Sequence, residues 1–395
     1  MMSGDQPVCS NRCDGAALVR AVPSRARRAL LWGLGLLCAS MAVPALARAD
    51  RQPFITGLTP ATIATTVPAN GDQNPYGIVS VPNSVGSLVS GHFLVSNFND
   101  QSNTQGTGNT QGTGTTIVQI PPGGNNQAGN ASVFAQITDP KCPGGVGLTT
   151  ALAVTRSGFV IVGSLPTQNG QLTTAGAGCL IVLDSHGNVV NTIAGGPING
   201  PWDMTAVDHG FFTTLYVTNV ENGDVATSAK PVDEGTVVRL QLLTIPGVTP
   251  AVLNKEVIAT GFPELASSTA VVLGPTGVAL SSSGTLYVAD TQANRIAAIP
   301  DATDRQFPIG GGGITVTSGG ALNGPLGMTL APNGDILTAN GNDGLVVETT
   351  PSGKQVAHVD TGFGTGSLFG LTVPPGAHKV YLVDDANNTL AVLQP

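Results

Sequence analysis

A short unit recurs along the chain. Residues 274–300 read GPTGVALSSSGTLYVADTQANRIAAIP, in which two apolar runs flank a polar turn and a third run follows. Further copies begin near 200, 324 and 369, and looser ones near 74 and 147. Each copy has the pattern of a four-stranded antiparallel meander whose first two strands are apolar on both faces. Neighbouring units must cover such faces, so the repeat predicts six blades packed radially into a β-propeller.

The composition agrees with an all-β fold. Hydrophobic residues make up 41% of the 395 positions and charged residues only 10%, whereas about a quarter is usual for the charged residues. The 53 glycines and 28 prolines follow no collagen-like period, so turns must hold them. Val, Thr, Leu and Ile dominate the apolar runs, which favours strands over helices.

The two ends of the repeat region predict how the ring closes. The last copy, 369–394, supplies a first, a second and a third strand and then the chain stops. An orphan strand, TIATTVP at 62–68, precedes the first copy. We expect this strand to complete the last blade, which removes an open sheet edge. The alternative is that 62–68 is an unstructured leader.

The first 49 residues have the layout of an export signal. Arginines at 25, 27 and 28 precede the apolar stretch ALLWGLGLLCASMAVPALA, and Ala47-Arg48-Ala49 forms a small-x-small cleavage site. We therefore expect residues 50–395 to form one propeller domain in the periplasm or outside the cell. An uncleaved membrane anchor is the alternative, and no later segment is apolar enough to span a bilayer.

Charge and cysteines limit the partners of the processed chain. Removal of 1–49 takes away six arginines and two aspartates, which leaves 10 basic and 22 acidic residues and a formal net charge of −12. This charge argues against nucleic acid as a partner. Only Cys142 and Cys179 remain, both expected at the top of the second blade, and they predict a disulfide. We expect a monomer.

Strand order decides which residues share a face. The loops from each second strand to the third, and from each fourth strand to the next first strand, lie on one face, which we call the top face. The ends of the second strands place a ring of polar residues there: Asn97, Ser164, Asn219, Asp290, Asn340 and Asp385. Such side chains commonly cap turns. The alternative is that the oxygens of Asn97, Asn219, Asp290, Asn340 and Asp385 bind a divalent cation, for which calcium is suited.

A second predicted ring lies at the start of the first strands: Tyr76, Thr150, Trp202, Thr276, Leu326 and Phe369. The next residue is small in most copies, but the third copy has Asp203 there, beside Trp202. Broken symmetry is where function is expected. Tyr76, Trp202, Asp203 and Phe369 are therefore our candidate ligand-binding residues, suited to a sugar or a cationic group. The alternative is that Trp202 packs against the next blade and Asp203 caps its own turn.

The segment GPTGVALSSSGTLYVADTQANRIAAI resembles an NHL repeat, and GPLGMTLAPNGDILTANGNDGLVV is a weaker copy. Together the six units resemble the propeller superfamily of NHL, SMP-30/gluconolactonase and streptogramin-lyase-like proteins. The resemblance implies a divalent cation held by Glu, Asn and Asp in lactonase relatives, and a histidine at the channel mouth in lyase relatives. None of the five histidines here is expected at that mouth, whereas Glu221 and Glu264 lie in loops that can approach it.

Two functions remain open from the sequence. The first is an exported scaffold that binds a small molecule, a glycan or a protein on its top face, where the loops of the first three copies are long. The second is a metal-dependent hydrolase or lyase of the lactonase kind, with its ion at the top of the central channel. The sequence names no catalytic residue.

Overall fold

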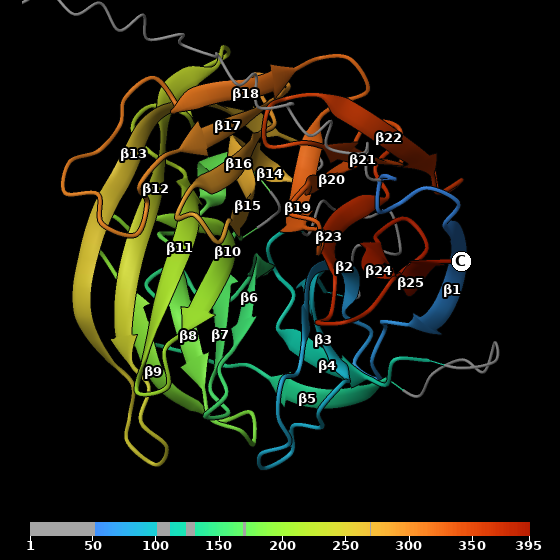
Figure 1. The fold of residues 1–395 in the computed structure, drawn as a ribbon. Coiled ribbons are helices and arrows are strands. Elements are labelled where there is room, and N and C mark those ends of the chain that lie inside the picture. The colour runs from blue at the N-terminus through green and yellow to red at the C-terminus, as the bar shows by residue number, and fades with distance from the viewer. Residues whose placement is uncertain (1–51, 101–110, 124–130, 169–170, 269) are drawn as a thin grey trace, which may run out of the picture. The chain divides into compact units, whose positions relative to one another are not determined.

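The computed structural model describes residues 52–100, 111–123, 131–168, 171–268 and 270–395. Six antiparallel sheets follow one another along the chain (Figure 1). The first strand of each sheet contacts the first strand of the next, and the first strand of the last sheet contacts that of the first. The sheets therefore form a closed ring, and the predicted six-bladed propeller is confirmed. The predicted export signal lies outside the described residues.

Each blade is a meander of neighbouring strands. The first blade holds β2 (Gln73–Ser80), β3 (Phe93–Asn99), β4 (Thr116–Ile120) and β5 (Ser132–Gln136). The second holds β6 (Leu148–Val154), β7 (Val160–Ser164), β8 (Cys179–Leu183) and β9 (Val189–Ala194), with a 3-10 turn, η2 (Leu172–Thr174), before β8. The third begins with β10 (Gly200–Asp208), β11 (Phe212–Val220), β12 (Val232–Leu243) and β13 (Ala251–Ser267).

The later blades are more regular. The fourth holds β15 (Pro275–Leu280), β16 (Leu286–Asp290), β17 (Arg295–Ile299) and β18 (Ile314–Ser318). The fifth holds β19 (Pro325–Leu330), β20 (Ile336–Asn340), β21 (Leu345–Thr349) and β22 (Gln355–Asp360). The sixth holds β23 (Leu368–Thr372), β24 (Val380–Asp384) and β25 (Thr389–Gln394). In the part of the chain that the structure describes, no helix is long and apolar enough to cross a membrane.

The third blade departs from the four-stranded pattern. Its β12 and β13 are 12 and 17 residues long, and they extend well beyond the neighbouring strands in Figure 1. A fifth strand, β14 (Val271–Leu273), folds back on the end of β13, pairing Leu265 with Leu273. This extra hairpin lies on the top face, because it leads directly into the first strand of the fourth blade.

The N-terminal segment closes the ring as predicted. Strand β1 (Thr59–Thr65) pairs antiparallel with β25, from Thr59 opposite Gln394 to Thr65 opposite Thr389. The strand begins and ends about three residues earlier than the predicted 62–68, in keeping with Pro68, which has no N–H to donate to a ladder. Just upstream, the N–H groups of Phe54 and Ile55 donate to the buried Glu348 carboxylate at 2.8 and 2.9 Å.

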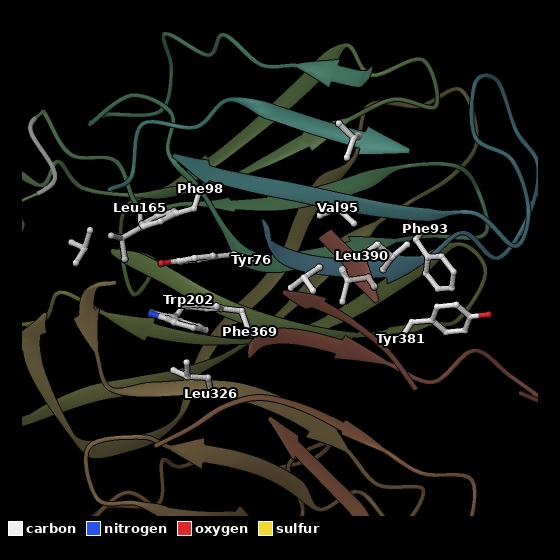
Figure 2. Close-up of a cluster of buried hydrophobic side chains, with 14 of the residues drawn as sticks. Tyr76, Phe93, Val95, Phe98, Leu165, Trp202, Leu326, Phe369, Tyr381 and Leu390 are labelled. Atoms are coloured by element: carbon white, nitrogen blue, oxygen red, sulfur yellow. The ribbon is translucent and has the colours of Figure 1, made fainter. Parts of the chain in front are cut away.

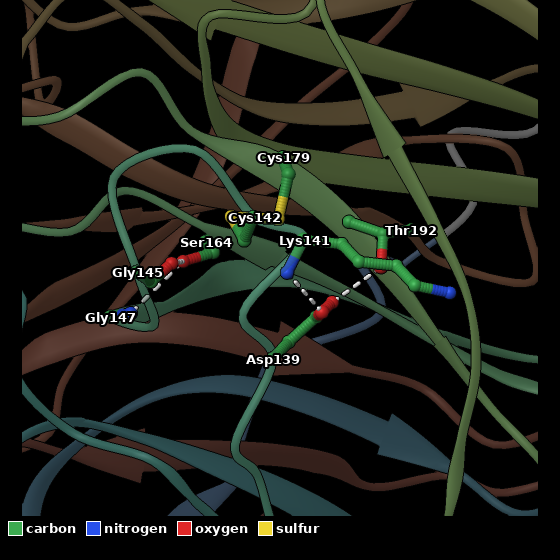
Figure 3. Close-up of a disulfide and its surroundings, with 8 residues drawn as sticks. All are labelled: Asp139, Lys141, Cys142, Gly145, Gly147, Ser164, Cys179 and Thr192. Carbon is green, nitrogen blue, oxygen red and sulfur yellow. Dashed lines mark hydrogen bonds between the residues drawn. A yellow bond between two sulfur atoms is a disulfide. The ribbon is translucent and has the colours of Figure 1, made fainter.

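The predicted disulfide is present. Cys142, in the loop before β6, is bonded to Cys179, the first residue of β8, and both are buried (Figure 3). The Ser164 hydroxyl fastens the same loop, since it accepts a hydrogen bond from Gly147 N–H at 2.9 Å and donates to Gly145 C=O at 3.1 Å. The disulfide therefore ties the top of the second blade to the approach of its first strand.

Candidate functional site

Four side chains from four different blades fill the centre of the ring. Tyr76 and Phe369 stack with ring centroids 3.9 Å apart, and Trp202 lies 6.2 Å from Phe369 in a near-parallel plane. Figure 2 shows these rings layered together, with Leu326 beside them. All four are at most 5% exposed. We call this group the aromatic plug. The predicted second ring does converge on the axis, but it closes the channel and does not form an open mouth.

The polar atoms of the plug are engaged with protein groups. Trp202 Nε1 donates to the Val272 carbonyl in β14 at 3.1 Å. The Tyr76 hydroxyl donates to Gln111 Oε1 at 3.3 Å. The indole therefore faces the extra hairpin of the third blade, and the phenol faces the long loop of the first blade.

A pocket of about 490 Å³ lies over the plug on the top face. Its floor is Leu326 and Phe369, and the hairpin residues Ala270 and Leu273 add an apolar wall. Polar groups come from the loops around it: Gln111, Thr291, Asn342 and Asp385. We call this the top pocket. An apolar cavity with a few convergent polar groups is the usual form of a small-molecule site.

Asp385 supplies the carboxyl group of the top pocket. Burial, together with the charge of Asp384, raises the pKa of Asp385 to about 8, although a hydrogen bond from Asn74 opposes the shift. Asp385 Oδ1 is buried and has no hydrogen-bond partner. The group therefore carries a proton at neutral pH, so it can donate a hydrogen bond to a ligand.

The predicted ring of polar residues at the ends of the second strands is wrong by one residue in the sixth blade. Strand pairing sets Asn97 opposite Pro75, and it sets Asn219, Asp290 and Asn340 opposite the matching prolines of their own blades. In the sixth blade Leu368 pairs with Asp384. Asp384, and not Asp385, therefore holds the ring position. The sequence did not distinguish the two residues, because Asp384 and Asp385 are adjacent and either can end the strand.

The ring residues make bonds with nearby backbone or side-chain groups. The amides of Asn97 and Asn340 donate to Thr66 C=O and Ala321 C=O at 2.9 and 2.7 Å, and Asp290 forms a 2.8 Å salt bridge with Arg295. The side-chain amide oxygens (Oδ1) of Asn97, Asn219 and Asn340 are buried and have no hydrogen-bond partner. Among the described residues, no group of three or more His, Cys, Asp or Glu side chains is placed to hold a metal ion. The ring as a cation site stays a prediction.

Two glutamates stand close together at the top of the third blade. Glu264, fully buried on β13, accepts the Asn222 N–H at 2.9 Å through Oε1, while its Oε2 has no partner. Burial raises its pKa to about 8. Burial and the charge of Glu264 also raise the pKa of Glu221 to about 8. Both carboxyls are therefore largely protonated at neutral pH.

Trp202 and Asp203 lie in different environments although they are adjacent in the chain. Trp202 belongs to the plug, whereas Asp203 lines a channel along the axis, formed by the first strands. The Asp203 carboxylate accepts the N–H groups of Met204 and Val278 at 2.8 and 3.2 Å, and the second bond joins the third blade to the fourth. The two residues therefore do not form one site.

Sequence reasoning missed most of the top pocket. Ala270 and Leu273 belong to the β13–β14 hairpin, which is not part of the repeat, and Asn342 and Thr291 occupy ordinary turn positions. One signal was available, because the third copy spans 75 residues from the start of β10 at 200 to the start of β15 at 275, whereas the fourth copy spans 50, from 275 to 325.

Comparisons with known proteins support the fold. No protein-family model and no curated protein matches the chain. Among solved structures it is similar to a luciferin-regenerating enzyme, with a TM-score of 0.53 and 10% identity over 86% of this chain and 96% of that one. It is also similar to a gluconolactonase from Xanthomonas campestris, with a TM-score of 0.49 and 14% identity over 87% of this chain and 96% of that one.

A third similar structure is the virginiamycin B lyase from Staphylococcus aureus, with a TM-score of 0.46 and 14% identity over 86% of this chain and 99% of that one. At such identities a likeness concerns the fold alone. The likeness to the luciferin-regenerating enzyme therefore supports the architecture that the strand order shows: the chain is a six-bladed β-propeller.

Proposed function

We propose that the protein binds a small uncharged molecule that carries a ring and a hydrogen-bond acceptor, in the top pocket. The observation that supports this most is the combination of an apolar floor, Leu326 and Phe369, with the protonated carboxyl of Asp385 in one cavity of about 490 Å³. That volume lies within the range of about 300–1,000 Å³ usual for small-molecule sites.

The lining favours a neutral ligand for physical reasons. The apolar floor and hairpin wall favour binding of a ligand that buries apolar surface against them. The protonated Asp385 can donate to a carbonyl or hydroxyl oxygen of the ligand, and Gln111 and Asn342 offer amide groups. Among the described residues, no lysine or arginine lines the pocket to pair with an anion.

The expected removal of the export signal predicts the compartment in which the protein works. We propose that residues 1–49 direct export and that the propeller works in the periplasm or outside the cell. The disulfide between Cys142 and Cys179 supports this, because such bonds persist in oxidising compartments.

A substitution that fills the top pocket tests the proposed function. Asn342 is exposed on the pocket wall, so Asn342→Trp is expected to occupy the cavity at little cost to folding. Neutral fluorinated aromatic fragments, followed by fluorine NMR, are expected to bind the unchanged protein and to lose at least about tenfold in affinity with Asn342→Trp. Ser352→Trp, at an exposed turn on the opposite face of the same blade, is the matched control. Equal binding by both variants would contradict the proposal.

A second candidate is a metal-dependent hydrolase or lyase, and Glu264 is the observation that favours it. Its buried Oε2 without a partner, beside Glu221 with a similarly unpaired Oε1, is suited to a hard divalent cation. These two glutamates would hold the ion, and Asn222 would orient Glu264 through its N–H. When bound, such an ion would polarise a carbonyl group of a substrate.

Calcium titration tests this second candidate. At 100 times its Kd, calcium is expected to stabilise the folded protein by about 2.7 kcal/mol, which raises the melting temperature. Glu264→Gln keeps the shape of the side chain and removes its charge, so it is expected to abolish the rise. A melting temperature of the unchanged protein that calcium, magnesium and manganese all leave unaltered would end the metal interpretation.

A further inference from the structure

A second cavity follows the axis on the other side of the aromatic plug. It measures about 200 Å³, and all of its lining residues come from the six first strands. Apolar side chains from all six first strands line it, although Asp203, threonines and backbone groups make its exposed surface more polar than apolar. The apolar side chains include Ile78, Leu152, Met204, Val278, Met328 and Leu371. We call it the axial channel. It is separate from the top pocket, with which it shares no lining residue.

The axial channel is closed at one end and open at the other. Toward the top face, Asp203 follows directly on Trp202 of the plug. Toward the bottom face, the lining residues near the ends of the first strands are partly exposed, among them Val154, Ala206 and Thr372. A ligand therefore enters from the bottom face, and the part that enters first meets Asp203.

Of the described residues that line the channel, Asp203 alone has a titratable side chain. It is 7% exposed, and neither of the two salt bridges among the described residues includes it. Its two hydrogen bonds come from backbone N–H groups, which do not cancel a full negative charge. Thr150 lines the same channel, and its buried hydroxyl has no partner. A buried carboxyl without a cation beside it is held in its neutral form, and a ligand that supplies a positive charge favours its ionised form.

We propose that the axial channel binds a primary alkylammonium group, with the ammonium end at Asp203 and Thr150 and the alkyl chain along the apolar side chains. An ammonium offers three donors, and here a carboxylate and a hydroxyl can accept from it. A divalent cation fits less well, because calcium takes six to eight oxygen ligands and usually several carboxylates.

The protonation of Asp203 gives this assignment a predicted pH dependence. Burial raises the pKa of Asp203 to about 8, so at pH 7 the free protein carries a carboxylic acid there. Binding of an alkylammonium ion ionises Asp203, and the released proton passes to solvent, so charge is conserved. Affinity should therefore rise up to about pH 8 and hold until the amine loses its own proton, near 10 for a lysine-like amine. In the part of the chain that the structure describes, no other titratable side chain faces the channel.

Calorimetric titration with n-hexylammonium chloride tests the proposal. Each added methylene should tighten binding about fourfold, so hexylammonium should bind more tightly than butylammonium. Hexanol and hexanoate have the same chain without the positive charge and should bind at least about tenfold more weakly. Hexanol binding as tightly as hexylammonium, or affinity that does not change between pH 6 and pH 8, would overturn the assignment.

Two variants locate the binding site. Thr372→Trp places a large ring at the partly exposed end of the channel and should abolish hexylammonium binding. Asn342→Trp fills the top pocket and should leave it unchanged, so failure of this proposal is distinguishable from failure of the top-pocket function. Asp203→Asn should weaken binding at least about tenfold. Asp203→Asn also removes one side-chain oxygen that accepts a backbone N–H group, so its result is interpreted together with that of Thr372→Trp. Hexylammonium binding that Thr372→Trp leaves intact would place the ligand elsewhere.

Discussion

Deletion of residues 52–65 is expected to abolish stable folding of the propeller. The segment includes all of β1, which is the fourth strand of the sixth blade, and the buried side chains of Ile55, Leu58 and Ala64. Its loss exposes the edge of β25 and leaves the buried Glu348 without the donors at Phe54 and Ile55. We expect the free energy of unfolding to fall by on the order of 5 kcal/mol or more.

Differential scanning calorimetry checks this expectation. The control is a chain that begins at residue 50, which lacks the expected export signal and keeps β1. The control should unfold in one cooperative transition, whereas the shorter chain should show a much lower transition or none. If both chains melt at the same temperature, the N-terminal strand does not close the ring.

Stability is expected to fall steeply as the pH rises from about 4 to about 8. Asp203, Glu221, Glu264 and Asp385 each have a folded-state pKa raised to about 8, with burial as the main cause. An exposed carboxyl titrates near pH 4, so between these values the folded state binds more protons than the unfolded state. Unfolding then releases protons, which lowers the free energy of unfolding as pH rises.

The effects of the four carboxyls have the same sign, so the free energy of unfolding should be lower at pH 9 than at pH 5 by several kcal/mol. Urea unfolding at pH 5, 7 and 9 measures it directly. Glu264→Gln should flatten the dependence, because a neutral amide no longer needs a proton inside the fold. A protein more stable at pH 9 than at pH 5 would show that these carboxyls are ionised in the folded state.

The fold was predictable because it repeats. Every first strand begins within one residue of its expected position, since alternating apolar runs and polar turns recur in each copy. The closing strand was predictable for the same reason, because the last copy lacked one strand. The disulfide was also expected, because both cysteines map to one end of one blade.

The candidate site was less predictable because it depends on side-chain direction. Tyr76, Trp202 and Phe369 converge as expected, yet their stacking closes the axis where the sequence indicated an opening. Trp202 and Asp203 are neighbours in sequence, but they lie on opposite sides of that closure. The wall of the top pocket comes from the β13–β14 hairpin, which has no counterpart in the other copies. Sequence periodicity predicts the repeated strands, whereas the top pocket is formed in part by a hairpin that does not repeat.

The most direct measurement for the proposed function is a crystal structure of the protein with the tightest neutral fragment from the fluorine NMR screen. Our account predicts the fragment's ring against Phe369 and Leu326, with an acceptor atom within hydrogen-bond distance of the Asp385 carboxyl. A fragment bound elsewhere, with the top pocket empty at saturating concentration, would contradict the proposal that this pocket is the binding site.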